Sequence, residues 1–129
     1  MTDFKPQNYN SLSPYIMVEG AQEFSDLLQN VFGAEELRKF EREDGSIMHL
    51  ELRIDDTVIM VSDATDDYPA NANILHVYVP DADATYQKAI EAGCEALEAP
   101  EHKDGDPDKR GAFLDFAGNY WSVSTQVAV

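Results

Sequence analysis

An internal repeat constrains this chain more than any other feature of its sequence. The segments VEGAQEF and FGAEE of the first half are matched by VPDADAT and AGCEA in the second half, in the same order. Equivalent landmarks keep a nearly constant separation: 61 residues from Val18 to Val79, 60 from Gly33 to Gly93 and 62 from Met60 to Ser122. Two copies are fewer than an open solenoid needs, so the repeat predicts two similar modules that pair with each other.

The first module is predicted to consist of a strand, a helix and three further strands. Residues Ser13–Val18 are strand-like, and residues Ala21–Gly33 carry apolar side chains at helical spacing before a closing glycine. The strand-like runs EELRKFERE, SIMHLELRI and TVIMVSD follow. They are separated by Asp44-Gly45 and Asp55-Asp56, which suit tight turns, so these runs predict a meander.

The second module repeats this order. ILHVYV predicts a strand and DADATYQKAIEAG predicts a helix, and three shorter runs, EALEA, RGAFLDF and NYWSVST, predict strands. In the helix we expect Ala84, Ala89, Ile90 and Ala92 to be available for burial, and we expect residues Ala99–Lys109 to form an exposed loop. The chain therefore reads as an α+β fold of two βαβββ modules, about 12–63 and 74–126, within a single domain of residues 1–129.

Charge and composition limit the partners of the protein. Asp and Glu number 25 against 9 Lys and Arg, so the net charge of −16 would repel nucleic acid and anionic membranes. We expect neither as a partner, although the acidity could favour a cationic ligand. The sequence has no secretory start and no long apolar run, and its single cysteine, Cys94, cannot form an internal disulfide. These features predict a cytoplasmic protein in which Cys94 is a small buried residue.

Alternation along the predicted strands divides their side chains between two faces. The first set is apolar and should pack under the helices: Ile16, Val18, Met48, Leu50, Leu52, Ile59, Val61, Leu75, Val77, Val79, Trp121 and Val123. The opposite set includes Ser13, Tyr15, Met17, His49, Glu51, Arg53, Val58, Met60, Ser62, His76, Tyr78, Tyr120, Ser122 and Ser124. Tyr, His and Met among small hydroxyls suit a partly dry binding pocket, while a filled sheet interior or a dimer interface is the alternative.

His49 and Glu51 stand two residues apart on one face of a predicted strand. Their spacing lets the carboxylate hold and orient the imidazole ring. Such a pair serves as a general base or orients a ligand, or it is a hydrogen-bonded pair of purely structural use.

The ordered motifs resemble one known family over nearly the whole chain. FGAEE, IMHLELRIDDTVIMVSD, HVYVPDADATYQKAIEAG and RGAFLDFAGNYWSVST look like the glyoxalase/bleomycin-resistance/extradiol-dioxygenase (vicinal oxygen chelate) superfamily, most of all its PhnB-like branch. The resemblance implies two βαβββ modules that each curl a mixed sheet into half of a cup, and a homodimer. It also implies that Arg110 holds an anionic group of a ligand, whereas the residues alone allow it to pair with Asp106 or Asp108.

The metal-dependent members of that family place His, Gln or Glu at four cup-facing positions. The matching positions here are Ser13, Met60, Ile74 and Ser122, and none is a good ligand for a divalent metal. The sequence therefore predicts no metal cofactor. A displaced divalent metal site made by His49, Glu51 and His76 stays open as an alternative.

We expect a small-molecule-binding protein of the resistance type that holds its ligand in the cup without the usual metal. The predicted ligand-binding residues are Tyr15, His49, Glu51, Met60, His76, Tyr78, Arg110, Tyr120 and Ser122. The first alternative is a lyase or dioxygenase-type enzyme that uses a displaced metal or has His49 and Glu51 as catalytic residues. The second is an interaction protein whose cup is mostly filled.

Overall fold

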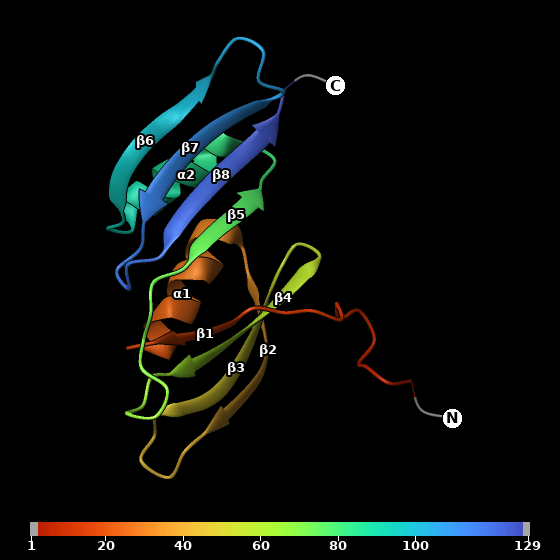
Figure 1. The fold of residues 1–129 in the computed structure, drawn as a ribbon, viewed down its shortest axis with the longest axis vertical. Coiled ribbons are helices and arrows are strands. Elements are labelled where there is room, and N and C mark those ends of the chain that lie inside the picture. Colours follow the sequence, from red (N-terminus) through yellow and green to blue (C-terminus); the bar gives the residue numbers. More distant parts are fainter. Residues whose placement is uncertain (1–2, 128–129) are drawn as a thin grey trace. The chain divides into compact units, whose positions relative to one another are not determined.

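The computed structural model describes residues 3–127 and divides into two compact units. Of the described residues, one unit consists of 3–29 and 33–71, and the other of 30–32 and 72–127. Figure 1 shows the ribbon with the helices and strands labelled. Neither helix within residues 3–127 is long and apolar enough to cross a membrane.

The first unit is a four-stranded mixed sheet with one helix. Its elements are β1 (Tyr15–Val18), α1 (Ala21–Phe32), β2 (Glu35–Glu41), β3 (Ile47–Ile54) and β4 (Thr57–Asp63). The strand order is β1-β4-β3-β2, in which β1 runs parallel to β4 and the remaining neighbours are antiparallel. The helix connects β1 to the far edge of its sheet, as a βαβββ module requires.

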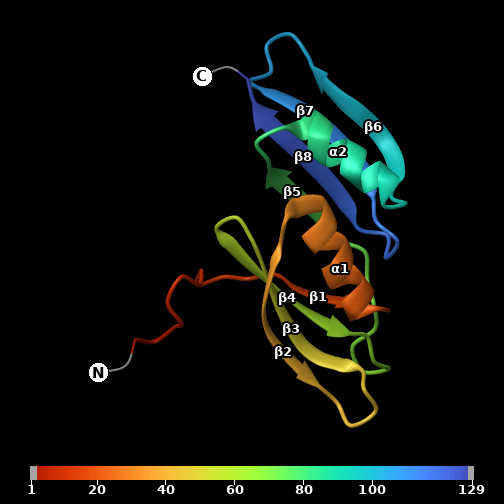
Figure 2. The same ribbon diagram turned by 180° about the vertical axis from the view of Figure 1, so that it is seen from behind.

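The second unit repeats this topology. Its elements are β5 (Ile74–Tyr78), α2 (Ala82–Glu91), β6 (Glu95–His102), β7 (Asp108–Leu114) and β8 (Tyr120–Gln126). The order β5-β8-β7-β6 again has a parallel pair, β5 with β8, and Figure 2 shows α2 lying across one face of this sheet. The predicted α+β class and the doubled βαβββ order are confirmed.

Each unit buries an apolar layer between its helix and its sheet. In the first, the periodic α1 residues Phe24 and Leu28 are buried, as are Ile16, Leu50, Leu52 and Val61 of the strands. The second buries Ala82, Thr85 and Ala89 of α2 together with Phe113, Trp121 and Val123. Full burial of such large apolar side chains contributes about 1.5–3 kcal/mol each, so these layers hold the sheets in register.

The repeat is also visible where the two helices begin. Gly20, which precedes α1, and Ala21, its first residue, donate their backbone N–H groups to Asp63 Oδ1 at 3.2 Å and 2.8 Å. Ala82, the first residue of α2, donates in the same way to Thr125 Oγ1 at 2.8 Å. Asp63 and Thr125 lie near the ends of the last strands of the two modules, so both modules cap their helix from the same place in the fold.

Two expectations for the second half are wrong. Ala84 and Ala92 are exposed, because the buried stripe of α2 follows Ala82, Thr85 and Ala89. Alanine gives little signal of which helix face is buried, and a threonine occupies the stripe instead. Residues Ala99–Lys109 are not one long loop, since β6 runs to His102 and β7 begins at Asp108. Backbone pairing of β6 with β7 outweighs the polar sequence of these segments.

Met48 was expected among the helix-facing residues, and this is also wrong. Its exposed fraction is 49%, whereas its neighbour Ile47 is only 4% exposed. The register of β3 against β2 shifts here: His49 pairs with Phe40, but the next partners are Ile47 and Glu41, so Met48 is an extra residue in β3. Such a bulge reverses the alternation beyond it and turns Met48 to the side away from the helix.

Candidate functional site

A chain of hydrogen bonds joins three of the predicted site residues in the first unit. His49 Nε2 lies 2.7 Å from Glu51 Oε2, and the hydroxyl of Tyr15 lies 2.9 Å from His49 Nδ1. The residues come from β1 and β3, which flank β4, and Tyr15 and Glu51 both pair with Met60 of that strand. Because directly paired residues share a face, these side chains lie on the face of the sheet away from α1, which we call the open face.

Glu51 is the buried end of this chain. It is 3% exposed, and its Oε1 accepts a 2.5 Å hydrogen bond from the hydroxyl of Tyr9, which belongs to the segment before β1. The guanidinium of Arg38 lies 3.8 Å from the same oxygen and 5.4 Å from the centre of the Tyr9 ring. Burial acts to raise the pKa of Glu51, but the hydrogen bonds from Tyr9 and His49 outweigh it and hold that pKa below its ordinary value.

An ionised Glu51 fixes the direction of the whole chain. A carboxylate accepts hydrogen bonds and cannot donate, so Tyr9 and His49 Nε2 are its donors. In neutral His49, Nδ1 is then left to accept the proton of the Tyr15 hydroxyl. Burial raises the pKa of Tyr15, so its hydroxyl stays neutral, and its oxygen can still accept a hydrogen bond from a ligand. The chain can orient Tyr15 toward a ligand, and it can pass a proton along its hydrogen bonds.

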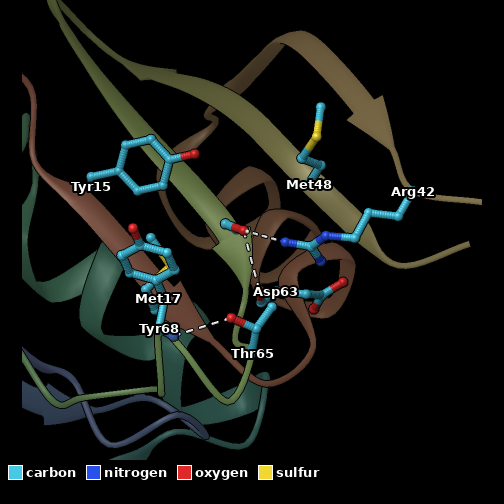
Figure 3. A pocket seen from close by; sticks show the side chains of 8 residues that line it. Tyr15, Met17, Arg42, Met48, Asp63, Thr65 and Tyr68 are labelled. Carbon is cyan, nitrogen blue, oxygen red and sulfur yellow. Dashed lines mark hydrogen bonds between the residues drawn. The ribbon is translucent and has the colours of Figure 1, made fainter. Parts of the chain in front are cut away.

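A pocket of about 370 Å³ opens beside Tyr15 on the open face of the first unit. Its lining residues are Tyr15, Met17, Arg42, Met48, Ser62, Asp63, Thr65 and Tyr68, and Figure 3 shows their side chains. Tyr68 is brought here by a short turn in which its backbone N–H donates to Thr65 Oγ1 at 3.1 Å. Two aromatic rings and two thioethers with a few polar groups form the lining that small-molecule sites typically have.

The other predicted site residue of the first unit, Met60, lies apart from this pocket. It lines a separate hollow with residues of the segment before β1, among them Tyr9, Leu12 and Ser13.

The predicted residues of the second unit form a polar cluster of their own. His76 Nε2 lies 3.1 Å from the Ser124 hydroxyl, and Tyr78 donates a 2.8 Å hydrogen bond to Asp108. Arg110 forms ion pairs with Asp106 at 3.3 Å and Asp108 at 3.7 Å. The structure therefore shows Arg110 in the ion pairs that the residues alone allowed.

Tyr120 and Ser122 alternate with the core residue Trp121 on β8. They pair with Ile74 and His76 of β5, so they share a face with the cluster.

Four positions of this chain match those at which metal-dependent members of the resembled family carry their metal ligands. The residues present there do not fit a divalent metal. Ser13, Met60, Ile74 and Ser122 offer two hydroxyls, a thioether and an alkyl group, and Ile74 is 83% exposed. Within residues 3–127, no three His, Cys, Asp or Glu side chains come together as a metal-binding group. The alternative metal site consists of His49, Glu51 and His76. In the structure, His49 and Glu51 are hydrogen-bonded to each other, and His76 is hydrogen-bonded to Ser124.

Cys94 is buried and free, as expected. Burial raises the pKa of its thiol to about 11, with a further contribution from the charge of Asp115. A thiol with so little thiolate at neutral pH is a weak nucleophile.

Sequence reasoning missed several residues of the site. Tyr9 lies in a polar segment without periodicity, and Arg42 and Tyr68 lie outside or at the end of strands, so alternation assigned none of them to a face. Met48 was placed on the wrong face because a one-residue bulge leaves no mark in a run of apolar residues. An isolated tyrosine among asparagines, as in QNYN, was the one available signal for Tyr9.

Comparison with known proteins agrees with this architecture. Residues 10–123 match the sequence profile described as Glyoxalase/Bleomycin resistance protein/Dioxygenase superfamily. An uncharacterized protein from Mycobacterium bovis is 28% identical over 91% of this chain and 84% of its own length.

Solved structures with the same fold share little sequence with this chain. TioX from Micromonospora sp. ML1 superposes with a TM-score of 0.71 and 18% identity, over 91% of this chain and 100% of its own. TnmS3, an antibiotic binding protein from Streptomyces sp. CB03234, superposes with a TM-score of 0.65 and 18% identity. The match covers 91% of this chain and 97% of TnmS3. A PhnB protein from Bacillus cereus superposes with a TM-score of 0.66 and 13% identity, over 90% of this chain and 99% of its own. These identities demonstrate a shared fold.

Proposed function

Because this chain belongs to the glyoxalase/bleomycin resistance protein/dioxygenase superfamily, we propose that it binds a small molecule in the pocket beside Tyr15, without a divalent metal. The pocket itself is the observation that carries the proposal. It has the volume of a small-ligand site, and its apolar walls, Met17, Met48 and Tyr68, stand next to a hydroxyl held in place by His49. The structural similarity to TnmS3, an antibiotic binding protein, supports this class of function.

Several polar features favour binding in this place. Tyr15 is hydrogen-bonded to His49, which is in turn bonded to Glu51, and these contacts orient the Tyr15 hydroxyl before a ligand arrives. A preformed site loses less conformational entropy on binding. An aromatic ligand could stack between Tyr15 and Tyr68 and place a donor group against the Tyr15 oxygen.

Methionine methyl groups supply a direct test. With ¹³C-methyl-methionine protein, a panel of cationic, neutral and anionic planar aromatic compounds is titrated while the methyl resonances are followed by NMR. We expect at least one compound to shift the resonances of Met17 and Met48, which line the pocket, more than that of Met60, which lines another hollow. The proposal fails if no compound moves Met17 or Met48, or if shifts concentrate on Met60.

A second candidate function rests on the hydrogen-bonded chain of Tyr15, His49 and Glu51. A tyrosine coupled to a histidine and a buried carboxylate can move a proton to or from a bound substrate, as an enzyme of the lyase class requires. Turnover of a pocket-binding compound by the wild-type protein, and its loss in the Tyr15→Phe variant with binding retained, would establish this activity. Binding without any turnover would favour the first proposal.

We further infer a cytoplasmic homodimer that binds neither nucleic acid nor membranes. The net charge of −16 and the single buried Cys94 support the setting, and family membership supports the dimer. Analytical ultracentrifugation of the full chain tests the oligomeric state, and a mass of one chain at micromolar concentration would contradict it.

A further inference from the structure

Arg42 reaches into the pocket of the first unit from the turn between β2 and β3. Its Nη1 donates to the Ser46 hydroxyl at 3.1 Å and to the Ile47 carbonyl oxygen at 3.3 Å, and its Nη2 donates to the Ser62 hydroxyl at 3.4 Å. Figure 3 shows the Arg42 side chain among the residues that line the pocket. These bonds hold the guanidinium plane and leave Nε–H and one Nη2–H without an acceptor among residues 3–127.

The guanidinium also lacks a carboxylate partner in a strongly acidic chain. Six of the nine basic residues form ion pairs with Asp or Glu: Arg38, Lys39, Arg53, Lys103, Lys109 and Arg110. Arg42 forms none with any carboxylate of the described residues, although it is half-buried and lines a pocket. A guanidinium placed in this way lies next to the ligand site without a direct ion-pair partner among residues 3–127.

The carboxylate that shares this pocket, Asp63, is engaged elsewhere. Its Oδ1 accepts from the N–H groups of Gly20 and Ala21 at the start of α1, and its Oδ2 accepts from the N–H of Ile47 at 2.7 Å. The positive end of the α1 dipole stabilises the Asp63 charge there. Nearby Asp44 is likewise bonded to the hydroxyl and the backbone N–H of Ser46. The positive charge of Arg42 is therefore the one available to a ligand.

We propose that the pocket selects an aromatic carboxylate. The carboxylate would accept both free hydrogens on the Nε and Nη2 edge of Arg42, a planar geometry that a guanidinium matches with two parallel hydrogen bonds. The aromatic part would lie against Tyr15, Met17, Met48 and Tyr68, which form the apolar lining. This inference rests on the proposed binding function and names the chemical class of its ligand.

The proposal is opposite to the ligand charge that the composition suggested. The net charge of −16 favours cations at long range, but exposed charges beyond about 10 Å are screened at 0.1 M salt. The contact with Arg42 is local and half-buried, where screening is weaker.

Two matched probes test the ligand class. Wild-type protein is titrated with 2-naphthoate and with its neutral analogue 2-naphthamide, and dissociation constants are read from the Met17 and Met48 methyl resonances. We expect 2-naphthoate to bind roughly 10-fold more tightly, since a charge-assisted hydrogen bond contributes more than a neutral one. The Arg42→Gln variant should lose most of this preference for 2-naphthoate over 2-naphthamide.

Arg110→Gln is the matched control, because it changes the net charge by the same amount at a residue that lines no part of this pocket. It should keep the preference for 2-naphthoate. Equal binding of both probes by the wild type, or a preference that survives Arg42→Gln, would overturn the carboxylate assignment while pocket binding stands. If neither probe shifts Met17 or Met48, pocket binding itself fails for aromatic ligands, and the assignment fails with it.

Discussion

Replacing Glu51 by Gln should destabilise the protein by about 1–4 kcal/mol at pH 7. The buried carboxylate accepts two hydrogen bonds, from Tyr9 at 2.5 Å and from His49 at 2.7 Å. Hydrogen bonds to a charged group contribute about 1.5–3 kcal/mol each, and neutral ones about 1 kcal/mol, so the neutral amide loses roughly 0.5–2 kcal/mol per bond. The ion pair with Arg38 adds little, since that side chain is 52% exposed and the charges lie 3.8 Å apart.

The assay is urea unfolding followed by far-UV circular dichroism, with Glu35→Gln as the control. Glu35 also pairs with an arginine, Arg53, but its side chain is 66% exposed, so the control should lose at most about 0.5 kcal/mol. Equal losses in the two variants would refute the assignment of Glu51 as a buried, doubly bonded carboxylate.

The pH dependence supplies a second check on the same variant. The pKa of Glu51 is lowered in the folded protein, so its stabilisation is present above the ordinary value of 4.5 and disappears as the pH falls through the lower folded value. The difference in unfolding free energy between wild type and Glu51→Gln should therefore shrink below about pH 4.5. A difference that stays constant down to pH 3 would contradict this reasoning.

Three further predictions concern binding, stability and reactivity. His49→Gln should weaken binding of an aromatic pocket probe roughly 3- to 10-fold in an NMR titration, because the Tyr15 hydroxyl loses the ring nitrogen that accepts its hydrogen bond. The control His102→Gln, at an exposed residue, should leave the affinity unchanged. Equal affinities of the two variants would make His49 purely structural. Asp115→Ala should lower the free energy of unfolding in urea by about 2–4 kcal/mol, because the buried carboxylate accepts from the Trp121 indole N–H at 2.8 Å. The control Asp104→Ala, at an exposed residue, should change the stability little. A similarly small loss in Asp115→Ala would refute this role of Asp115. The pKa of the Cys94 thiol is raised from 9.0 to about 11 in the folded protein. At pH 8 the thiol should therefore react with a disulfide reagent roughly 100-fold more slowly in the folded than in the unfolded protein. Similar rates in the two states would show that the thiol is accessible.

The last hairpin shows how far local sequence can determine structure. The sequence predicts a tight turn at Gly118, and this glycine has the positive φ, 84°, that such turns require. Trp121 is 2% exposed and lies in the core, as predicted. Asp115 fastens the turn by accepting from the N–H groups of Ala117 and Asn119. All these partners lie within six residues of one another, so the information that forms the hairpin is contained in the segment itself.

By itself, the sequence determined the element order, the two βαβββ modules and the neighbouring pair of His49 and Glu51, because periodicity and short spacings are local properties of the chain. Only the tertiary structure decided what surrounds that pair. Tyr9 lies 42 residues from Glu51, and the shift at Met48 depends on a neighbouring strand. Arg42 meets Ser62 across 20 residues, so the charge offered to a ligand depends on contacts distant in sequence that no local pattern contains.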